Sequence, residues 1–389
     1  MDKRVYMLTA IAFVVGLSEL IVGGILDLIA DDLHIRVSAA GLLITVFAFV
    51  FGISSPILLV TFSKTERVNL AFGALIVFFI GSVIAVISPN YTVLFISRVI
   101  SAASGSLATV LCINLASRIV APQYRGRAIG LVVMGISGSL VLGLPVGVLL
   151  GNLFNWRVPF ILVAILTIIL LITMRVSLGR VEAGETIPLR EQVRTLKDYR
   201  VLFAHLTTFF FLAGHFTLYG FLTPYVKTTM GFAGITISIL YFIYGIAAVS
   251  GGGLTGMTSD RFGNRTTLLT VSALLVVCLF VIPYAVKIVP IFWVVLVIWG
   301  VMSWGITPPV QSHLYEVAQA TADIQQSLNN AALQLGIAFG TLFGSFIIEV
   351  GTIEQTPHYG IILVILSLVS AMIATRTERS GRQYADTTL

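Results

Sequence analysis

The segment Val68–Ser88, VNLAFGALIVFFIGSVIAVIS, carries no charged side chain over 21 residues. A helix needs about 20 predominantly apolar residues to cross the hydrocarbon core of a bilayer. We therefore expect this segment to be a membrane-spanning helix.

Runs of the same kind recur along the rest of the chain. The hydropathy pattern predicts twelve spanning helices near residues 5–26, 38–61, 68–88, 92–118, 126–151, 157–175, 201–226, 234–257, 266–286, 290–315, 326–350 and 358–375. Only 10% of the residues are charged, whereas a soluble domain carries about 25%. The chain is therefore expected to be an all-α membrane protein with lipid as its solvent.

One long polar stretch, residues 176–200, interrupts this pattern. It separates a predicted six-helix bundle at 1–175 from a second at 201–375, and residues 376–389 form a polar tail. We expect the stretch 176–200 to be a linker between two halves.

The basic residues indicate the orientation of the helices. Of the 23 Lys and Arg residues, 18 fall on the side of the two termini, four (Arg36, Arg157, Lys227 and Lys287) fall on the other side, and Arg98 lies within a helix. Basic residues concentrate in cytoplasmic loops. We therefore expect both termini in the cytoplasm, and we attribute the net charge of +6 to this bias rather than to a nucleic-acid partner.

The two halves share short similar sequences at corresponding positions, and the second half carries a specific motif. Val93–Ile96 matches Val295–Ile298, and Gly256–Arg265, GMTSDRFGNR, resembles the loop signature G-x-x-x-D-R-x-G-x-R of the major facilitator superfamily. The resemblance implies the major facilitator fold, with two pseudo-symmetric halves. It also implies a gating role for Gly256, Asp260, Arg261, Gly263 and Arg265, with Arg125 and Arg127 as partners. The first-half copy departs from the motif at Ser63 and Glu66.

The helix near 126–151 contains Gly143, Pro145 and Gly147. This run resembles the antiporter signature of drug and metabolite exporters, which implies export rather than import. Small residues let membrane helices approach closely, so the alternative to a role in export is a purely structural role in helix packing.

Two charges lie inside apolar helices, where an ionised group is expensive. Glu19 and Arg98 each fall seven residues below the outer end of their predicted helices, or roughly 10 Å deep. We expect a Glu19–Arg98 pair that lines a cavity, with Glu19 as the proton carrier. A static structural ion pair is the alternative.

His215 occupies in the helix at 201–226 the position that Glu19 occupies in the first helix, and we expect it to take part in proton coupling. Candidate substrate contacts are aromatic and amide side chains at similar depth. They are Tyr219, Trp299, Trp304, Asn114, Gln311, Asn330 and Gln334. Packing and interhelical hydrogen bonds are the alternatives for each.

Several segments resemble a narrower group within the superfamily. Gly16–Leu26 looks like the first helix of bacterial sugar-efflux and purine-efflux proton antiporters, and Leu212–Tyr219, Ile298–Gly300 and Asp323–Ser327 are similar to purine base and nucleoside efflux pumps. The resemblance implies proton-driven export of purine bases or nucleosides by a monomer in the bacterial plasma membrane, with no cofactor. Asp27 departs from the proline that usually ends this helix.

The same residues bear on other possible functions. A multidrug or sugar exporter of the same superfamily is the nearest alternative. An intramembrane enzyme would need clustered catalytic or metal-binding groups, whereas His205, His215, His313 and His358 are scattered. A channel would need a filter or a ring of charges. No nucleotide-binding motif is present, so we expect an ion gradient to supply the energy.

Overall fold

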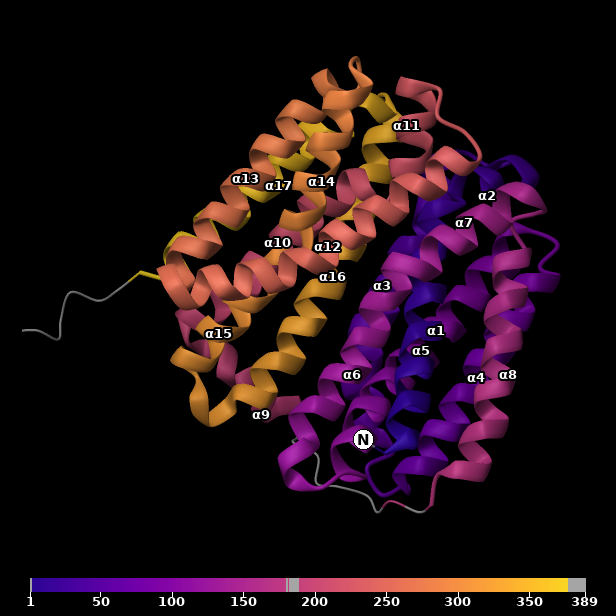
Figure 1. The fold of residues 1–389 in the computed structure, drawn as a ribbon, viewed down its shortest axis with the longest axis vertical. Coiled ribbons are helices and arrows are strands. Elements are labelled where there is room, and N and C mark those ends of the chain that lie inside the picture. The colour runs from indigo at the N-terminus through magenta and orange to yellow at the C-terminus, as the bar shows by residue number, and fades with distance from the viewer. Residues whose placement is uncertain (1, 180, 182–188, 377–389) are drawn as a thin grey trace, which may run out of the picture.

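The computed structural model describes residues 2–179, 181 and 189–376 (Figure 1). The N-terminal half contains α1 (Lys3–Gly24), α2 (Leu26–Asp32), α3 (Val37–Thr61), α4 (Arg67–Ile87), α5 (Tyr91–Arg118), η1 (Pro122–Tyr124), α6 (Arg125–Gly138), η2 (Ser139–Gly143), α7 (Leu144–Leu153) and α8 (Val158–Ser177).

The second half follows after α9 (Leu189–Arg194) and η3 (Thr195–Lys197). It contains α10 (Tyr199–Tyr219), α11 (Leu222–Met230), α12 (Ile235–Phe262), α13 (Asn264–Ala285), α14 (Val289–Gly305), α15 (Thr307–Val317), η4 (Gln319–Thr321), α16 (Ala322–Val350), η5 (Ile353–Gln355) and α17 (Thr356–Ala374). The predicted tail lies outside the described residues except for Arg376.

Twelve of the described segments are long and apolar enough to cross a membrane. They match the twelve spans predicted from hydropathy, so the all-α fold class is confirmed. Apolar side chains such as Ile172, Val176 and Val294 are exposed on the outer surface, which suits a protein that is surrounded by lipid.

Polar residues begin several of these helices. The Glu66 carboxylate accepts hydrogen bonds from the backbone N–H groups of Val68 and Asn69 at 3.0 and 2.7 Å. Asn90 and Asp198 cap α5 and α10 in the same way. These caps satisfy backbone donors that lack partners in the first turn.

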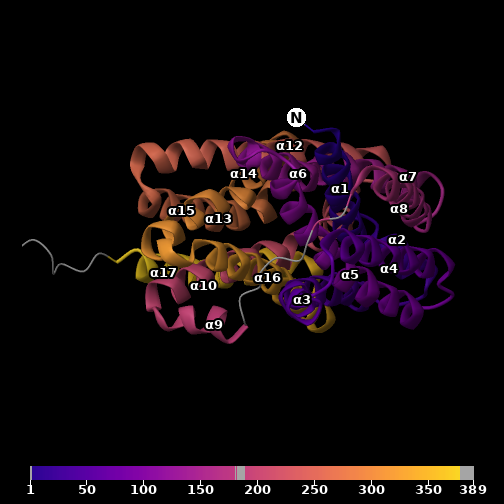
Figure 2. The ribbon, with the colours of Figure 1, turned by 90° about the horizontal axis from the view of Figure 1, so that it is seen from below.

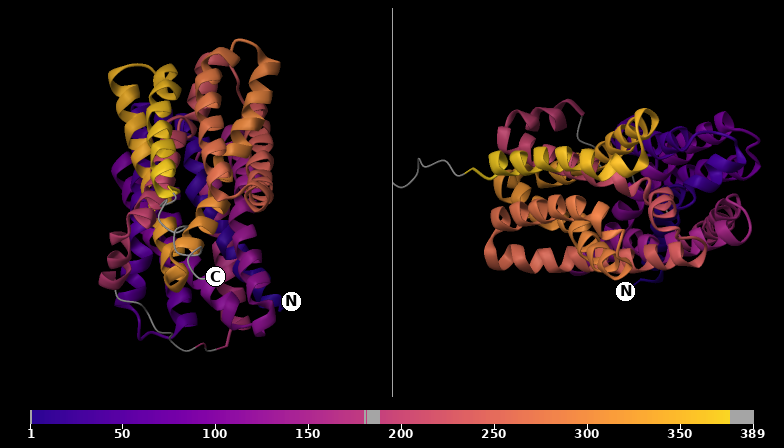
Figure 3. Two further views of the ribbon diagram at one scale, coloured as in Figure 1. Left: turned by 90° about the vertical axis from the view of Figure 1, so that its left-hand side faces the viewer. Right: turned by 90° about the horizontal axis from the view of Figure 1, so that it is seen from above.

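The helices form two bundles that lie side by side, as Figures 1, 2 and 3 show. The bundles meet along α3 against α16 and along α7 with η2 against α12. We call the end at which α1 begins the terminal end, and the opposite end, where α2 and α11 lie, the α2–α11 end (top of Figure 1).

Two predicted helices are broken, contrary to expectation. The first predicted helix ends close to its expected end: α1 stops at Gly24, and Ile25, with φ of −120° and ψ of 20°, separates it from the short α2. The helix predicted at 201–226 breaks at Gly220–Phe221, and the one predicted at 290–315 breaks at Ile306, before the prolines that open α15. Hydropathy does not detect such breaks, because it averages over about 20 residues and is insensitive to one non-helical residue.

The motif at 256–265 is also placed differently from expectation. Helix α12 was predicted to end near residue 257, but it continues to Phe262. The turn is made at Gly263, whose φ of +84° is accessible to glycine. Most of the motif is therefore helical.

Candidate functional site

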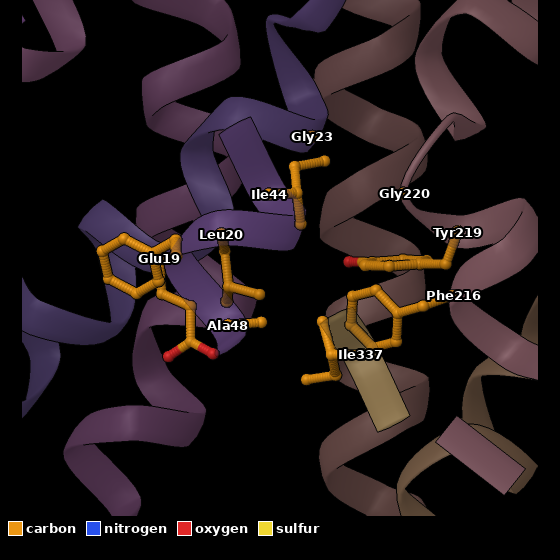
Figure 4. Close-up of a pocket in the computed structure, with 10 residues that line it drawn as sticks. Glu19, Leu20, Gly23, Ile44, Ala48, Phe216, Tyr219, Gly220 and Ile337 are labelled. Atoms are coloured by element: carbon orange, nitrogen blue, oxygen red, sulfur yellow. The ribbon is translucent and has the colours of Figure 1, made fainter. Parts of the chain in front are cut away.

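A small cavity lies between the two bundles (Figure 4). Helices α1 and α3 face it from one bundle, and α10 and α16 face it from the other. Its lining residues are Glu19, Leu20, Gly23, Ile44, Phe47, Ala48, Phe216, Tyr219, Gly220 and Ile337. The wall is mostly apolar, with two polar side chains.

Glu19 is the acidic side chain of this cavity. Its Oε1 accepts a hydrogen bond from Nε2 of Gln334 on α16 at 2.9 Å. The bond joins the two bundles at the level of the cavity. Sequence reasoning named both residues but did not connect them, because no sequence pattern relates α1 to α16.

The predicted direct pair between Glu19 and Arg98 is not formed. Arg98 is 1% exposed, and its Nη1 donates to the backbone carbonyl of Ser18 at 2.8 Å, with Nη2 3.4 Å from the Glu19 carbonyl. Its guanidinium also lies 4.0 Å from the centre of the Phe47 ring. Arg98 thus meets the backbone of α1, while the Glu19 carboxylate is on the cavity wall.

Tyr219 is the second polar side chain of the cavity. Its hydroxyl is buried and has no hydrogen-bond partner among the described residues. Its ring lies against His215 at a centroid distance of 5.0 Å and against Tyr244 at 4.8 Å. Figure 4 shows the ring directed from α10 toward the N-terminal bundle.

Both ring nitrogens of His215 have partners behind Tyr219. Nε1 of Trp299 donates to Nδ1 at 3.0 Å, and Nε2 lies 3.2 Å from the hydroxyl of Tyr244. An indole N–H only donates, so Nδ1 is an acceptor and Nε2 carries the proton of a neutral imidazole. His215 therefore holds Tyr219 in place, and its proposed proton coupling stays a prediction.

The remaining predicted substrate contacts do not line the cavity. Trp299 is fully buried behind it, and Trp304 is partly buried. Three amide side chains, Asn114, Gln311 and Asn330, are exposed elsewhere. Of the predicted amides, only Gln334 reaches the cavity region, through Glu19.

The predicted gating residues Asp260, Arg261 and Arg265 are exposed at the terminal end. No hydrogen bond or ion pair of Asp260 is found within the described ranges, and the expected contact with Arg125 or Arg127 is not formed. The adjacent turn is bonded within its own bundle, where Asn264 accepts from Ser259 and donates to Glu316.

Gly143 in η2 and Gly147 in α7 bring this segment close to α1. A Cβ on Gly147 would clash with Cδ1 of Ile21, and one on Gly143 would lie 3.1 Å from Cδ1 of Leu17. Pro145 follows the wide π-helical turn η2, which tolerates a residue without an N–H. The run therefore packs helices tightly, and its conformational role stays a prediction.

The α2–α11 end is closed by contacts that the sequence did not reveal. Lys227 on α11 pairs with Asp27 on α2, and the Thr223 hydroxyl donates to the Gly24 carbonyl at 3.1 Å. Further contacts across the same end are Arg36 with Glu349, Ser38 with Glu349, and Thr45 with Thr341. These contacts between the described parts of the two bundles, together with the Glu19–Gln334 bond, all lie at or beyond the level of Glu19 on this side.

No three His, Cys, Asp or Glu side chains come together in the described residues to form a metal site. The candidate site is thus the cavity between the bundles, with Glu19 and Tyr219 on its wall.

Comparison with known proteins gives a consistent family match. The model of the Major Facilitator Superfamily matches residues 8–341. An uncharacterized MFS-type transporter of Bacillus subtilis, YbcL, is 30% identical over 370 residues and 95% of each chain. The Escherichia coli inner membrane transport protein YdhP is 26% identical over 368 residues and 94% of each chain.

Solved structures show the same fold. A bacterial homolog of the human lysosomal transporter Spinster, solved inward-facing and occupied, superposes with a TM-score of 0.81 at 16% identity, over 96% of this chain and 97% of that one. Its inward-facing, unoccupied form gives a TM-score of 0.78 at 15% identity, over 96% and 98%.

Proposed function

This chain belongs to the major facilitator superfamily of membrane transporters, and from that premise we propose that it exports purine bases or nucleosides in exchange for protons. As a multi-pass transporter it is not an enzyme. The purine cargo follows the resemblance of Leu212–Tyr219 and Ile298–Gly300 to purine efflux pumps.

One observation carries the proposal, namely the Glu19 carboxylate on the wall of a largely apolar cavity between the two bundles. An ionisable group inside a membrane domain is costly and marks an ion or substrate pathway. The site also lies between the two repeats, where transporters of this type hold their cargo.

The exchange works through competition for one carboxylate. An ionised Glu19 accepts a hydrogen bond from an N–H group of the solute, and a protonated Glu19 has one acceptor oxygen fewer. Because proton and solute compete, entry of a proton from outside favours release of the solute there. The proton gradient is then the energy source, and no cofactor is needed.

The closed α2–α11 end supports an inward-facing conformation, provided that the positive-inside bias places this end outside the cell. The protein then works as a monomer in the plasma membrane of a bacterium, and protons and the solute are its partners. It has no nucleic-acid partner.

The test is counterflow in proteoliposomes with labelled hypoxanthine and adenine, with and without a pH gradient. The wild type should exchange label, and the gradient should drive net transport. Glu19→Gln should abolish proton-driven transport while the protein still inserts and folds. Glu354→Gln, an exposed carboxylate in η5, is the matched control and should transport normally.

Two results would contradict the proposal. No transport of either base by a folded wild type would remove the purine cargo. Full proton-driven transport by Glu19→Gln would remove the proton-carrier role.

A second cargo is favoured by one observation. Apart from Glu19 and Tyr219, the lining side chains are all apolar, and an apolar pocket with one carboxylate also suits a lipophilic cation. A sugar would find few partners for its hydroxyls there. Resistance of an expressing strain to lipophilic cations, with none to purine analogues, would favour the multidrug alternative.

A further inference from the structure

Among the described residues that line the cavity, two carry hydrogen-bonding side chains, and these lie in opposite bundles. Glu19 projects from α1, and Tyr219 projects from α10 (Figure 4). Between them the wall is made of apolar side chains, among them Ile44, Phe47 and Phe216. A solute held here can therefore be polar at two edges and must be apolar on its remaining surface.

The Tyr219 hydroxyl is fixed in position without a partner of its own. Tyr219 is 6% exposed, and its ring is stacked on His215 with an interplanar angle of 25°. His215 is in turn held by Trp299 and Tyr244. A buried hydroxyl left unpaired is unfavourable. Because the ring is held in place, the cavity is the side from which a partner can reach the hydroxyl.

Glu19 has capacity for a further hydrogen bond. Gln334 occupies Oε1, and no partner of Oε2 is found among the described side chains. The carboxylate can thus accept from a solute N–H while it keeps its bond to the other bundle. The side chains of Glu19 and Tyr219 therefore favour a solute with a hydrogen-bond donor at one edge and an acceptor or donor at the opposite edge.

We infer, on the basis of the proposed function, that this cavity takes the free purine base rather than the nucleoside, with Tyr219 as a base-binding residue. The base donates an N–H to Glu19 and accepts a hydrogen bond from the Tyr219 hydroxyl at its opposite edge. The ribose of a nucleoside adds three hydroxyls, and the apolar wall offers them no side-chain partners.

The size of the effect follows from the cost of unpaired polar groups. A site that leaves added hydroxyls unpaired discriminates against them by about tenfold to a hundredfold. We therefore expect bases to bind at least about tenfold more tightly than the corresponding nucleosides.

Gly23 offers an independent steric test of the same cavity. A Cβ at this position would lie 3.8 Å from both Cδ1 of Ile44 and the carbonyl oxygen of Gly220. Those are ordinary contact distances, so Gly23→Ala narrows the cavity without a clash. It should weaken base binding while the melting temperature stays near that of the wild type.

The experiment is competition binding on the purified full-length protein, with tritiated hypoxanthine as the probe. Unlabelled hypoxanthine and adenine should displace it at concentrations at least about tenfold lower than inosine and adenosine. Tyr219→Phe should weaken hypoxanthine binding about fivefold to tenfold, because it removes one hydrogen bond. Tyr284→Phe, an exposed tyrosine on α13, is the matched control and should bind as the wild type does.

The outcomes separate this inference from the proposed function. If nucleosides compete as well as bases, the inference is overturned while purine export stands. If Tyr219→Phe and Gly23→Ala both fold and both bind hypoxanthine normally, the assignment of this cavity is overturned. If the folded wild type binds no purine, the proposed purine cargo fails and the inference fails with it.

Discussion

Arg98 illustrates how a single charge is accommodated inside this apolar protein. The guanidinium has no carboxylate partner among the residues that the structure describes, and it instead uses the Ser18 carbonyl and the face of the Phe47 ring. Carbonyl oxygens and aromatic faces both carry partial negative charge, so they stabilise a buried cation without a second ion. Glu19 is consequently left for the cavity rather than being neutralised by a direct bond.

The hydrogen bonds of the single residue His215 give a prediction about stability. His215→Phe keeps an aromatic ring but leaves the Trp299 N–H and the Tyr244 hydroxyl without this partner. Each buried group left unsatisfied costs about 1–3 kcal/mol. The melting temperature of the detergent-solubilised protein should therefore fall, as measured by thermal unfolding.

His358→Phe is the control for this measurement, because His358 is exposed. An unchanged melting temperature in His215→Phe would contradict the positioning role. If the variant folds normally but its transport no longer depends on pH, the proton-coupling role of His215 is supported instead.

At the scale of helices, the breaks in α1 and α10 explain how the α2–α11 end closes. The break at Ile25 leaves carbonyl groups at the end of α1 without helical partners. The C-terminal bundle supplies donors for them: Thr223 bonds the Gly24 carbonyl, and the Tyr241 hydroxyl lies 3.4 Å from that of Gly23. The short helices α2 and α11 then place Asp27 beside Lys227.

The Asp27–Lys227 pair should bias the conformation of this end. Lys227→Met removes the cation and leaves a largely buried carboxylate, so states open at this end should become more populated. Spin labels at positions 31 and 228, both exposed, would report a longer distance between α2 and α11. The native Cys112 and Cys278 are buried, which favours selective labelling.

The reciprocal exchange Asp27→Lys with Lys227→Asp is the matched control and should restore the short distance. If Lys227→Met leaves the distance distribution unchanged, the pair does not hold this end closed.

Asp32 ties α2 to the start of α8 and gives a pH-dependent prediction. The hydrogen bond from the Trp156 indole, followed by Arg157, holds the pKa of Asp32 below its ordinary value of 3.8. A lowered folded-state pKa contributes stability that is fully present above the ordinary pKa and is lost as pH falls through the folded-state value.

Asp32→Asn should therefore lower the melting temperature at neutral pH, and its difference from the wild type should shrink below about pH 4. The effect should be small, because the Asp32 side chain is 40% exposed and is screened by solvent. Asp31→Asn, at an exposed neighbouring carboxylate, should change nothing. A pH-independent difference would contradict the ion-pair explanation.

At the scale of the whole molecule, the side-chain bonds from Asp27, Arg36, Ser38 and Thr45 to the other bundle gather toward the α2–α11 end. Side-chain bonds join the described parts of the bundles from Glu19 to the α2–α11 end, whereas the motif residue Asp260 at the terminal end lacks its expected partner. Rocking of one bundle against the other would break the contacts at the α2–α11 end and bring the two bundles together at the terminal end. Formation of an Asp260 contact in the alternate conformation would agree with the gating role that the motif implies.

The orientation of the whole molecule in the membrane gives a further prediction. In intact cells, a membrane-impermeant maleimide should label Lys287→Cys, which follows α13 and lies at the α2–α11 end. It should label Lys64→Cys, at the terminal end, only after permeabilisation. Both positions are exposed. The opposite labelling pattern would invert the orientation and place the closed end in the cytoplasm.

The sequence alone determined the twelve spans and the family, and it predicted the orientation. Hydropathy, loop charge and the motif at 256–265 are properties of contiguous residues, so they can be recognised without a structure. The same reasoning singled out Glu19, Tyr219 and Gln334 as functional candidates, since each is a polar group within an apolar helix.

Only the tertiary structure decided what these residues contact. Glu19 bonds Gln334, which is 315 positions away, while Arg98 reaches the backbone of α1 some 79 to 80 positions away. The helix breaks at Ile25 and Gly220 likewise depend on donors and packing from the other bundle. Partners of this kind are set by how the bundles dock, because hydropathy specifies that a helix lies in lipid but not which of its faces meets which neighbour.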